Sequence, residues 1–199
     1  MASNRRIGAE NSKSRAALLD ATEQIMLEEG YAAVSSRRIA QKAGLKPQLV
    51  HYYFRTMDDL FLAAFRRRAE DGLERQAQAL ASGQPLRALW AFGDDSTGTA
   101  LTMEFVALAN HHKSIRSEIA HYAELFRSRQ TEALAAVMRG HGIDVERYPP
   151  VAMMLLMTSV SQVLVMEEAL GMSAGHAETR ALVARYLERY EATPQSSAP

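Results

Sequence analysis

A chain of 199 residues, 47% hydrophobic and 23% charged, is long and apolar enough to bury a core, which excludes an intrinsically disordered protein. The absence of cysteine excludes disulfide bonds, thiol nucleophiles and cysteine-ligated zinc, and it fits a reducing cytoplasm. A net charge of zero argues against general polyanion binding, although residues 1–55 hold nine Lys or Arg against five Asp or Glu, an excess of +4 that favours nucleic acid at that end.

The first elements in chain order are a basic arm and a helix. Residues 1–12 are polar and lack the apolar core of a secretion signal, so we expect a flexible basic arm. Leu18, Ala21 and Ile25 then share one face at helical spacing, which predicts a helix over about residues 13–29.

Residues 35–54, with the sequence SSRRIAQKAGLKPQLVHYYF, predict two short helices joined by a tight turn. Ser35 is a favourable N-cap for the first helix. Gly44 ends that helix, because glycine enters the left-handed conformation without strain. Pro47 suits the first position of the second helix, where its missing N–H is not needed. This geometry is typical of a unit that places one helix in the DNA major groove.

Arg37 and Arg38 stand in the first turn of the first of these two helices. The helix macrodipole disfavours cations at that place. Their position therefore indicates an anion from outside the chain, and DNA phosphate is the obvious candidate.

The rest of the chain also has helical periodicity. Thr56 caps a helix that runs to about residue 80. The uncharged stretch Val151–Met166 has 16 residues and is too short and too polar to span a bilayer, so we expect a buried helix and no membrane segment. Residues 192–199 have the composition of a disordered tail. Further helices are expected at about residues 86–92, 99–111, 114–139, 150–171 and 174–190, which makes nine helices in an all-α protein.

These segments resemble the TetR family of bacterial transcriptional regulators. The resemblance rests on the run IAQKAGLKPQLVHYYF and the TMDDL that follows it, and it covers about residues 13–62. It implies a helix-turn-helix DNA-binding domain at residues 13–56 and a helical ligand-binding and dimerisation domain at residues 57–191. The last two helices would then form a four-helix bundle with their copies in a second subunit of a homodimer.

The resemblance assigns DNA contacts to the two short helices. Independently of it, Gln48 suits a bidentate pair with adenine, Lys46 can donate to guanine or phosphate, and Leu49 can pack on a thymine methyl. Val50 and Phe54 are interpreted as core residues of the three-helix unit. The residues expected at the DNA are Ser35 and Arg37 on phosphates, Lys46, Pro47, Gln48 and Leu49 on base edges, and His51, Tyr52 and Tyr53 on bases or phosphates.

Two positions depart from the family pattern. Leu49 stands where a hydroxyl residue is common, so the operator sequence does not transfer from a relative. Met57 stands where a lysine is common and removes a phosphate contact. We expect other cations to compensate, namely Arg55 or the arm residues Arg5, Arg6 and Lys13.

The body of the protein carries weaker signals. The apolar run at residues 151–166 and the small residues Ala177, Ala181 and Ala184 agree with a dimer, although a monomer core would show the same pattern. A small-molecule pocket is implied among the body helices, and each of its candidate side chains also fits plain core packing. No cationic cluster interrupts the apolar stripes, which favours a lipophilic or aromatic effector. The expected effector-binding residues are Trp90, Met103, Phe105, Tyr122, Phe126 and Met157.

Other classes of protein have less support. A metal-responsive regulator is one alternative, suggested by His111, His112 and His121. Adjacent histidines point about 100° apart on a helix, so His111 and His112 would not easily bind one ion, and no ligand spacing completes a tetrahedral site. No catalytic motif occurs, so neither an enzyme nor a cofactor is expected. A helical lipophile-binding protein without DNA binding would leave the paired arginines at a helix start unexplained.

The sequence thus predicts a cytoplasmic, ligand-responsive transcriptional regulator. We expect a repressor that binds a near-palindromic operator as a dimer. A small effector would release it by moving the helix at residues 57–80 and changing the separation of the two recognition helices.

Overall fold

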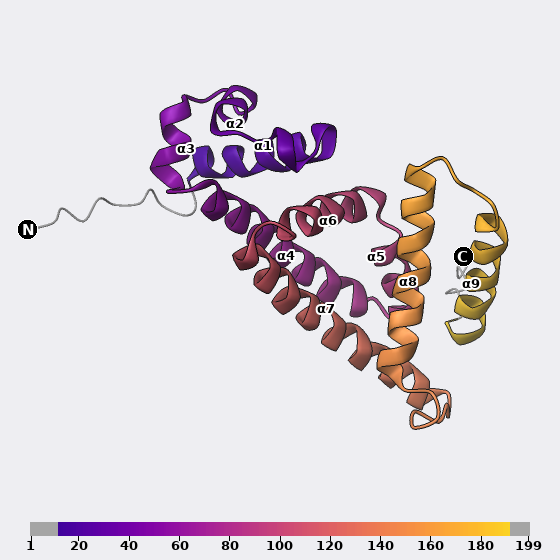
Figure 1. The fold of residues 1–199 in the computed structure, drawn as a ribbon. Helices are drawn as coiled ribbons and strands as arrows, with labels where there is room; N and C mark the ends of the chain where they lie inside the picture. Colours follow the sequence, from indigo (N-terminus) through magenta and orange to yellow (C-terminus); the bar gives the residue numbers. More distant parts are fainter. Residues whose placement is uncertain (1–11, 192–199) are drawn as a thin grey trace, which may run out of the picture. The chain divides into compact units, whose positions relative to one another are not determined.

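The computed structural model describes residues 12–191, which form nine α-helices and one 3-10 turn without a strand (Figure 1). The arm expected at residues 1–12 and the tail expected at residues 192–199 lie outside this range, except for Ser12, whose Oγ accepts the Arg15 N–H at 3.1 Å and caps the first helix. The helices are α1 (Lys13–Glu29), α2 (Ser36–Lys42), α3 (Pro47–Tyr53), α4 (Met57–Leu80), α5 (Pro85–Gly93), α6 (Ser96–Ala109), α7 (Lys113–Gly140), α8 (Pro150–Ala169) and α9 (His176–Tyr190), and the 3-10 turn is η1 (Tyr31–Ala33).

The bounds of α6 differ from the prediction. The loop expected before residue 99 is shorter, because Asp95 begins the helix: its Oδ1 accepts the Gly98 N–H at 3.0 Å, and its carbonyl accepts the Thr99 N–H at 2.9 Å. Gly93, expected in that loop, ends α5 instead. A Cβ at Gly93 would collide with Oγ of Ser161 on α8, so a glycine is required where α5 and α8 approach each other.

The chain forms two compact units, and it passes between them within α4, α6 and α7. The first unit contains residues 12–71 and 100–122, and the second contains residues 72–99 and 123–191. The predicted boundary at residue 56 separates a DNA-binding domain from a ligand-binding domain, which is a different division, and it stays a prediction. The core of the first unit includes Leu18, Leu19, Ile25, Met26, Ile39, Val50, Leu60, Phe105 and Ile115.

The second unit is built around a cluster of buried apolar side chains from α5, α7, α8 and α9. Its buried members are Leu86, Leu89, Leu134, Met138, Met154 and Leu187. Glu191 closes one end of this cluster: its carboxylate accepts the N–H groups of Leu86 and Arg87, at 2.6 and 3.0 Å, and so caps the start of α5.

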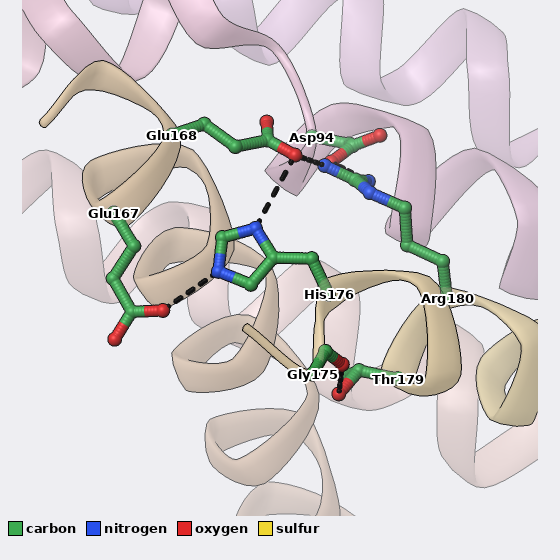
Figure 2. Close-up of polar contacts among 7 residues, drawn as sticks. All are labelled: Asp94, Glu167, Glu168, Gly175, His176, Thr179 and Arg180. Carbon is green, nitrogen blue, oxygen red and sulfur yellow. Dashed lines mark hydrogen bonds and ion pairs between the residues drawn. The ribbon is translucent and has the colours of Figure 1, made fainter. Parts of the chain in front are cut away.

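Charged side chains fix the turn between α8 and α9 (Figure 2). His176, which is buried, lies 2.7 Å from Glu167 and 3.5 Å from Glu168. Arg180 reaches Glu168 at 2.8 Å and Asp94, the residue that follows α5, at 2.5 Å. The Arg180 hydrogen bond holds the pKa of Glu168 below its usual value. The network therefore ties α9 to α8 and α5 by ion pairs.

The prediction that α8 is buried is wrong. The helix extends past the uncharged run to Ala169, and only 22% of its most apolar 18-residue window is buried. By length and composition it is the one helix among residues 12–191 that could cross a membrane, with a mean hydropathy of 1.5 in that window. The sequence failed here because α8 is apolar around most of its circumference, so its pattern does not reveal which side lacks a covering helix.

Candidate nucleic-acid interface

The start of α2 has the predicted cap. Ser35 has extended backbone angles, and its Oγ accepts the Arg38 N–H at 3.4 Å. This bond uses the hydroxyl as an acceptor, so its O–H is still able to donate to a phosphate oxygen.

The two arginines of this helix start differ in their surroundings. Arg38 pairs with Glu29 and donates to the Ala33 carbonyl at 3.5 Å, so the anion that its position called for comes from the chain itself. Inferring an outside anion from Arg38 was therefore wrong. Arg37 is exposed and makes no hydrogen bond or ion pair with residues 12–191. Arg37 is therefore the arginine for which an anion from outside the chain is still expected.

The turn between α2 and α3 follows the predicted chemistry. Gly44 has φ +65, a conformation that residues with a side chain rarely adopt. The Leu45 N–H donates to the Ala40 carbonyl at 2.8 Å, which closes the turn. Lys46 is extended, as expected before a proline, and Pro47 opens α3.

The α3 helix has one buried and one exposed side. Val50 and Phe54 are 1% and 4% exposed, which confirms that they belong to the core. Leu49 and Tyr53 are half-buried, and the Tyr53 ring packs edge-on against Tyr52 at 5.0 Å. The predicted DNA-binding side chains that lie exposed on the first turns of α3 are Lys46, Pro47, Gln48, His51 and Tyr52.

Some cations near this surface are held by acids of the same unit, and others are not. Lys42 pairs with Glu28, and Arg67 of α4 pairs with Asp20 and Glu23 of α1 at 2.7 and 2.8 Å. The Lys42 hydrogen bond keeps the pKa of Glu28 below its usual value. No such partner within the described range holds Arg37, Lys46 or Arg55, and all three are exposed. Their charge is therefore available to an outside anion.

Two contacts between distant segments hold the first unit together. The carboxylate of Glu104 on α6 accepts the Tyr31 N–H at 2.7 Å, where α1 gives way to η1. Arg66 of α4 forms a bidentate pair with Glu118 of α7, at 2.6 and 2.9 Å, and this pair lowers the pKa of Glu118. The sequence missed these partners because they are 73 and 52 positions apart.

The predicted effector-binding residues fall into two groups. In the first unit the Phe65 ring contacts both Phe105 and Tyr122, at 5.3 and 5.8 Å, while Met103 is 39% exposed. In the second unit Trp90 and Met157 pack on the apolar cluster, and the Phe126 ring contacts Phe92 at 5.8 Å. The six residues thus divide between the two units, and their assignment to one effector site stays a prediction.

The histidines considered as metal ligands have other contacts. His112 lies 2.8 Å from Asp58, and the His121 ring packs on Tyr122. Within residues 12–191 no three His, Asp or Glu side chains are placed to share a metal ion.

Comparisons with known proteins identify the same region. The family model of bacterial regulatory proteins of the tetR family matches residues 18–64. The HTH-type transcriptional regulator BetI of Rhizobium meliloti (strain 1021) is 38% identical over 52 residues, which span only 26% of this chain and 26% of that regulator.

Similar solved structures extend the likeness of fold beyond that region. E. coli NemR in its reduced form has a TM-score of 0.70 at 18% identity and covers 91% of this chain and 99% of its own. A TetR transcription regulator from Haloarcula marismortui ATCC 43049 has a TM-score of 0.69 at 17% identity and covers 89% and 95%. Residues 18–64 therefore match the model of the tetR family of bacterial regulatory proteins, and the chain shares its fold with these two solved structures along most of its length.

Proposed function

We propose that this protein is a ligand-responsive transcriptional regulator, most simply a repressor, that binds a near-palindromic operator through α3. The observation that carries the proposal is the exposed face of α3, with Lys46, Gln48 and His51 presented together above a buried Val50. Arg37 and Arg55 flank this face, and both lack an acid partner within the described range. Cations on phosphate would position the helix, and Gln48 would read adenine.

A homodimer through α8 and α9 completes the operator-binding unit. Two half-sites one helical turn apart require two recognition helices about 34 Å apart, and one chain supplies only one. The exposed apolar side chains of α8 and α9 supply a surface for a second copy, and a dimer would remove them from water. They include Val151, Leu155, Leu156, Val163, Met166, Leu182 and Tyr186.

Release by an effector follows from the connections of the DNA-reading unit. Residues 100–122 of α6 and α7 share one compact unit with α1–α3, and Glu104 and Glu118 hold them to η1 and α4. An effector that displaces α4 or α6 would therefore carry the helix-turn-helix with it. The effector must prefer the displaced state, because equal affinity for both states would shift nothing.

Fluorescence anisotropy with promoter DNA from the neighbourhood of the gene tests the proposal. We expect sequence-selective binding at moderate salt. Gln48→Ala should weaken binding by about 1–3 kcal/mol and relax the preference at one base pair, whereas Lys46→Ala should weaken all sequences alike. Lys113→Ala, which removes an exposed lysine at the start of α7, is the matched control and should leave affinity unchanged. Binding without sequence preference would refute the regulator and favour a lipophile-binding protein.

A further inference from the structure

Gln76 interrupts the apolar side of α4. Its side chain is 1% exposed, and neither Nε2 nor Oε1 has a hydrogen-bond partner within residues 12–191. Glu74 and Gln78 on either side of it are exposed, whereas Leu73 and Leu80 of the same helix pack inward. An amide buried in this way is unfavourable, because both of its polar ends lose water and gain no bond in exchange.

Two contacts set the register between α4 and α7 in this unit. A Cβ at Gly72 would lie 2.9 Å from the ring of Phe126, and Nη1 of Arg129 donates to the Leu73 carbonyl at 3.1 Å. Both contacts advance in the same direction along the two helices, so α4 and α7 run parallel here. One turn further, this register brings position 76 beside positions 130–132.

Thr131 falls within that stretch; the residue is half-buried, and its Oγ1 atom is buried without a hydrogen-bond partner among residues 12–191. One turn further along, Leu134 belongs to the apolar cluster and Leu80 packs against it. On the other side, the ring of Phe126 contacts Phe92 at 5.8 Å. The two unpartnered groups thus lie between two apolar walls. Apolar walls with a few converging polar groups are typical of small-molecule sites.

We propose that Gln76 and Thr131 recognise the effector, and that the effector is an uncharged, largely apolar molecule with a donor beside an acceptor, as on the edge of a carboxamide or lactam. The glutamine amide presents a donor and an acceptor side by side and complements that edge, while the threonine hydroxyl supplies a third bond. Neither group carries a charge that would offset the desolvation of an ionic ligand. This assignment rests on the proposed function, because it names the effector class of the same regulator.

The burial of both groups also explains why such a ligand would change the conformation. Both groups are closed off from solvent, so a ligand reaches them only when α4 and α7 separate locally. Binding then favours an arrangement other than the ligand-free one, which is the condition for a ligand to shift an equilibrium.

The first test is the thermal stability of the ligand-free, full-length protein. Gln76→Met keeps the length of the side chain and removes the two unpartnered atoms, so the unfolding midpoint should rise by about 2–4 °C. Gln78→Met, an exposed glutamine of the same helix, is the matched control and should change the midpoint little. A fall in the midpoint of the Gln76 variant would show that protein or water already satisfies this amide, and would overturn the proposal.

The second test compares ε-caprolactam with cycloheptanone, a ring of the same size without the N–H donor. Binding is followed by thermal shift and by the side-chain amide signals of ¹⁵N-labelled protein. The wild-type protein and the Gln78 variant should bind the lactam about tenfold more tightly than the ketone, and the Gln76 variant should lose this preference. Equal affinity for both rings, no binding of the lactam up to its solubility limit, or a preference that survives in the Gln76 variant would overturn the proposal.

Operator binding is measured in parallel by anisotropy. If the wild-type protein binds no operator, the regulator function fails whatever the lactam does. If it binds the operator and shows no lactam preference, only the effector assignment fails.

Discussion

The cationic side chains of the helix-turn-helix form two groups: those paired with an acid of the same chain and those without such a partner among the described residues. Arg38 and Lys42 pair with Glu29 and Glu28, and these acids keep a low pKa because the cations hydrogen-bond to their charged form. Arg37 has no such partner within residues 12–191 and stays the better candidate for a phosphate contact. The sequence placed both arginines at the helix start correctly, but it could not distinguish them, because the distinction depends on where α1 lies.

Arg55 is the cation that we expect to replace the lysine missing at Met57. It is exposed directly after α3, and no acid within the described residues neutralises it. Arg55→Ala should lower operator affinity uniformly across sequences and reduce the slope of log K against log salt by about 1. Arg139→Ala, an exposed arginine near the end of α7, serves as the control. An unchanged slope in the Arg55 variant would show that another group supplies the contact.

Helices were predictable from sequence where caps and periodicity agree. The bounds of α1 and α4 match the predicted ranges, because Gly30 ends α1 and Thr56 caps α4, its Oγ1 accepting the Asp59 N–H at 3.0 Å. The 3-10 turn η1 was missed, because a single turn leaves no periodic signal. The exposure of α8 was missed for a different reason: burial depends on neighbouring helices, which a nearly uniform apolar pattern does not specify.

The exposed side of α8 should carry the dimer. Leu156 is 62% exposed in the middle of that helix, so Leu156→Glu should place a charge in the interface and yield a monomer in sedimentation velocity. Loss of the second half-site should weaken operator binding by about 10²-fold or more.

Leu27→Glu, at an exposed leucine of α1, controls for a general effect of an added charge and should leave the dimer intact. Membrane binding is the other explanation of an exposed apolar α8, and flotation with lipid vesicles distinguishes it from dimerisation. If the wild-type protein is monomeric and floats with vesicles, the dimer proposal is wrong.

Local sequence patterns did not predict the division of the protein into two compact units. It depends on contacts between distant segments, such as Glu104 with Tyr31 and Arg66 with Glu118. The six effector candidates also divide between the two parts, whereas residue type alone grouped them together. Sequence therefore predicted the fold class and the exposed side of α3, but not the contacts between distant segments that hold each unit together.

Stability should fall at acid pH because several glutamates are ion-paired. Hydrogen bonds from Lys42, Arg38, Arg66 and Arg180 lower the pKa of Glu28, Glu29, Glu118 and Glu168 from the ordinary value of 4.5. A carboxyl whose pKa is lower in the folded state stabilises the fold above its unfolded pKa, and this contribution disappears as the pH falls through the folded pKa.

The unfolding midpoint should therefore decline progressively as the pH falls below about 4.5. Glu118→Gln removes one titrating partner, so it should lower the midpoint at pH 7 and reduce the further loss on acidification. Thermal unfolding monitored by circular dichroism between pH 7 and pH 3 measures both. An identical pH dependence in the variant would contradict a role for the Arg66–Glu118 pair.

The hydrogen bond from Tyr31 to Glu104 limits how freely the helix-turn-helix of this protein can be joined to another body. The carboxylate of Glu104 on α6 accepts a backbone N–H of the helix-turn-helix region directly after α1. A chimera that joined residues 1–56 to the body of another regulator would leave the Tyr31 amide without its acceptor, unless the sixth helix of that body carried an acid at the matching place. Transfer of residues 1–56 of this protein to another body therefore requires that Glu104 be transferred with them.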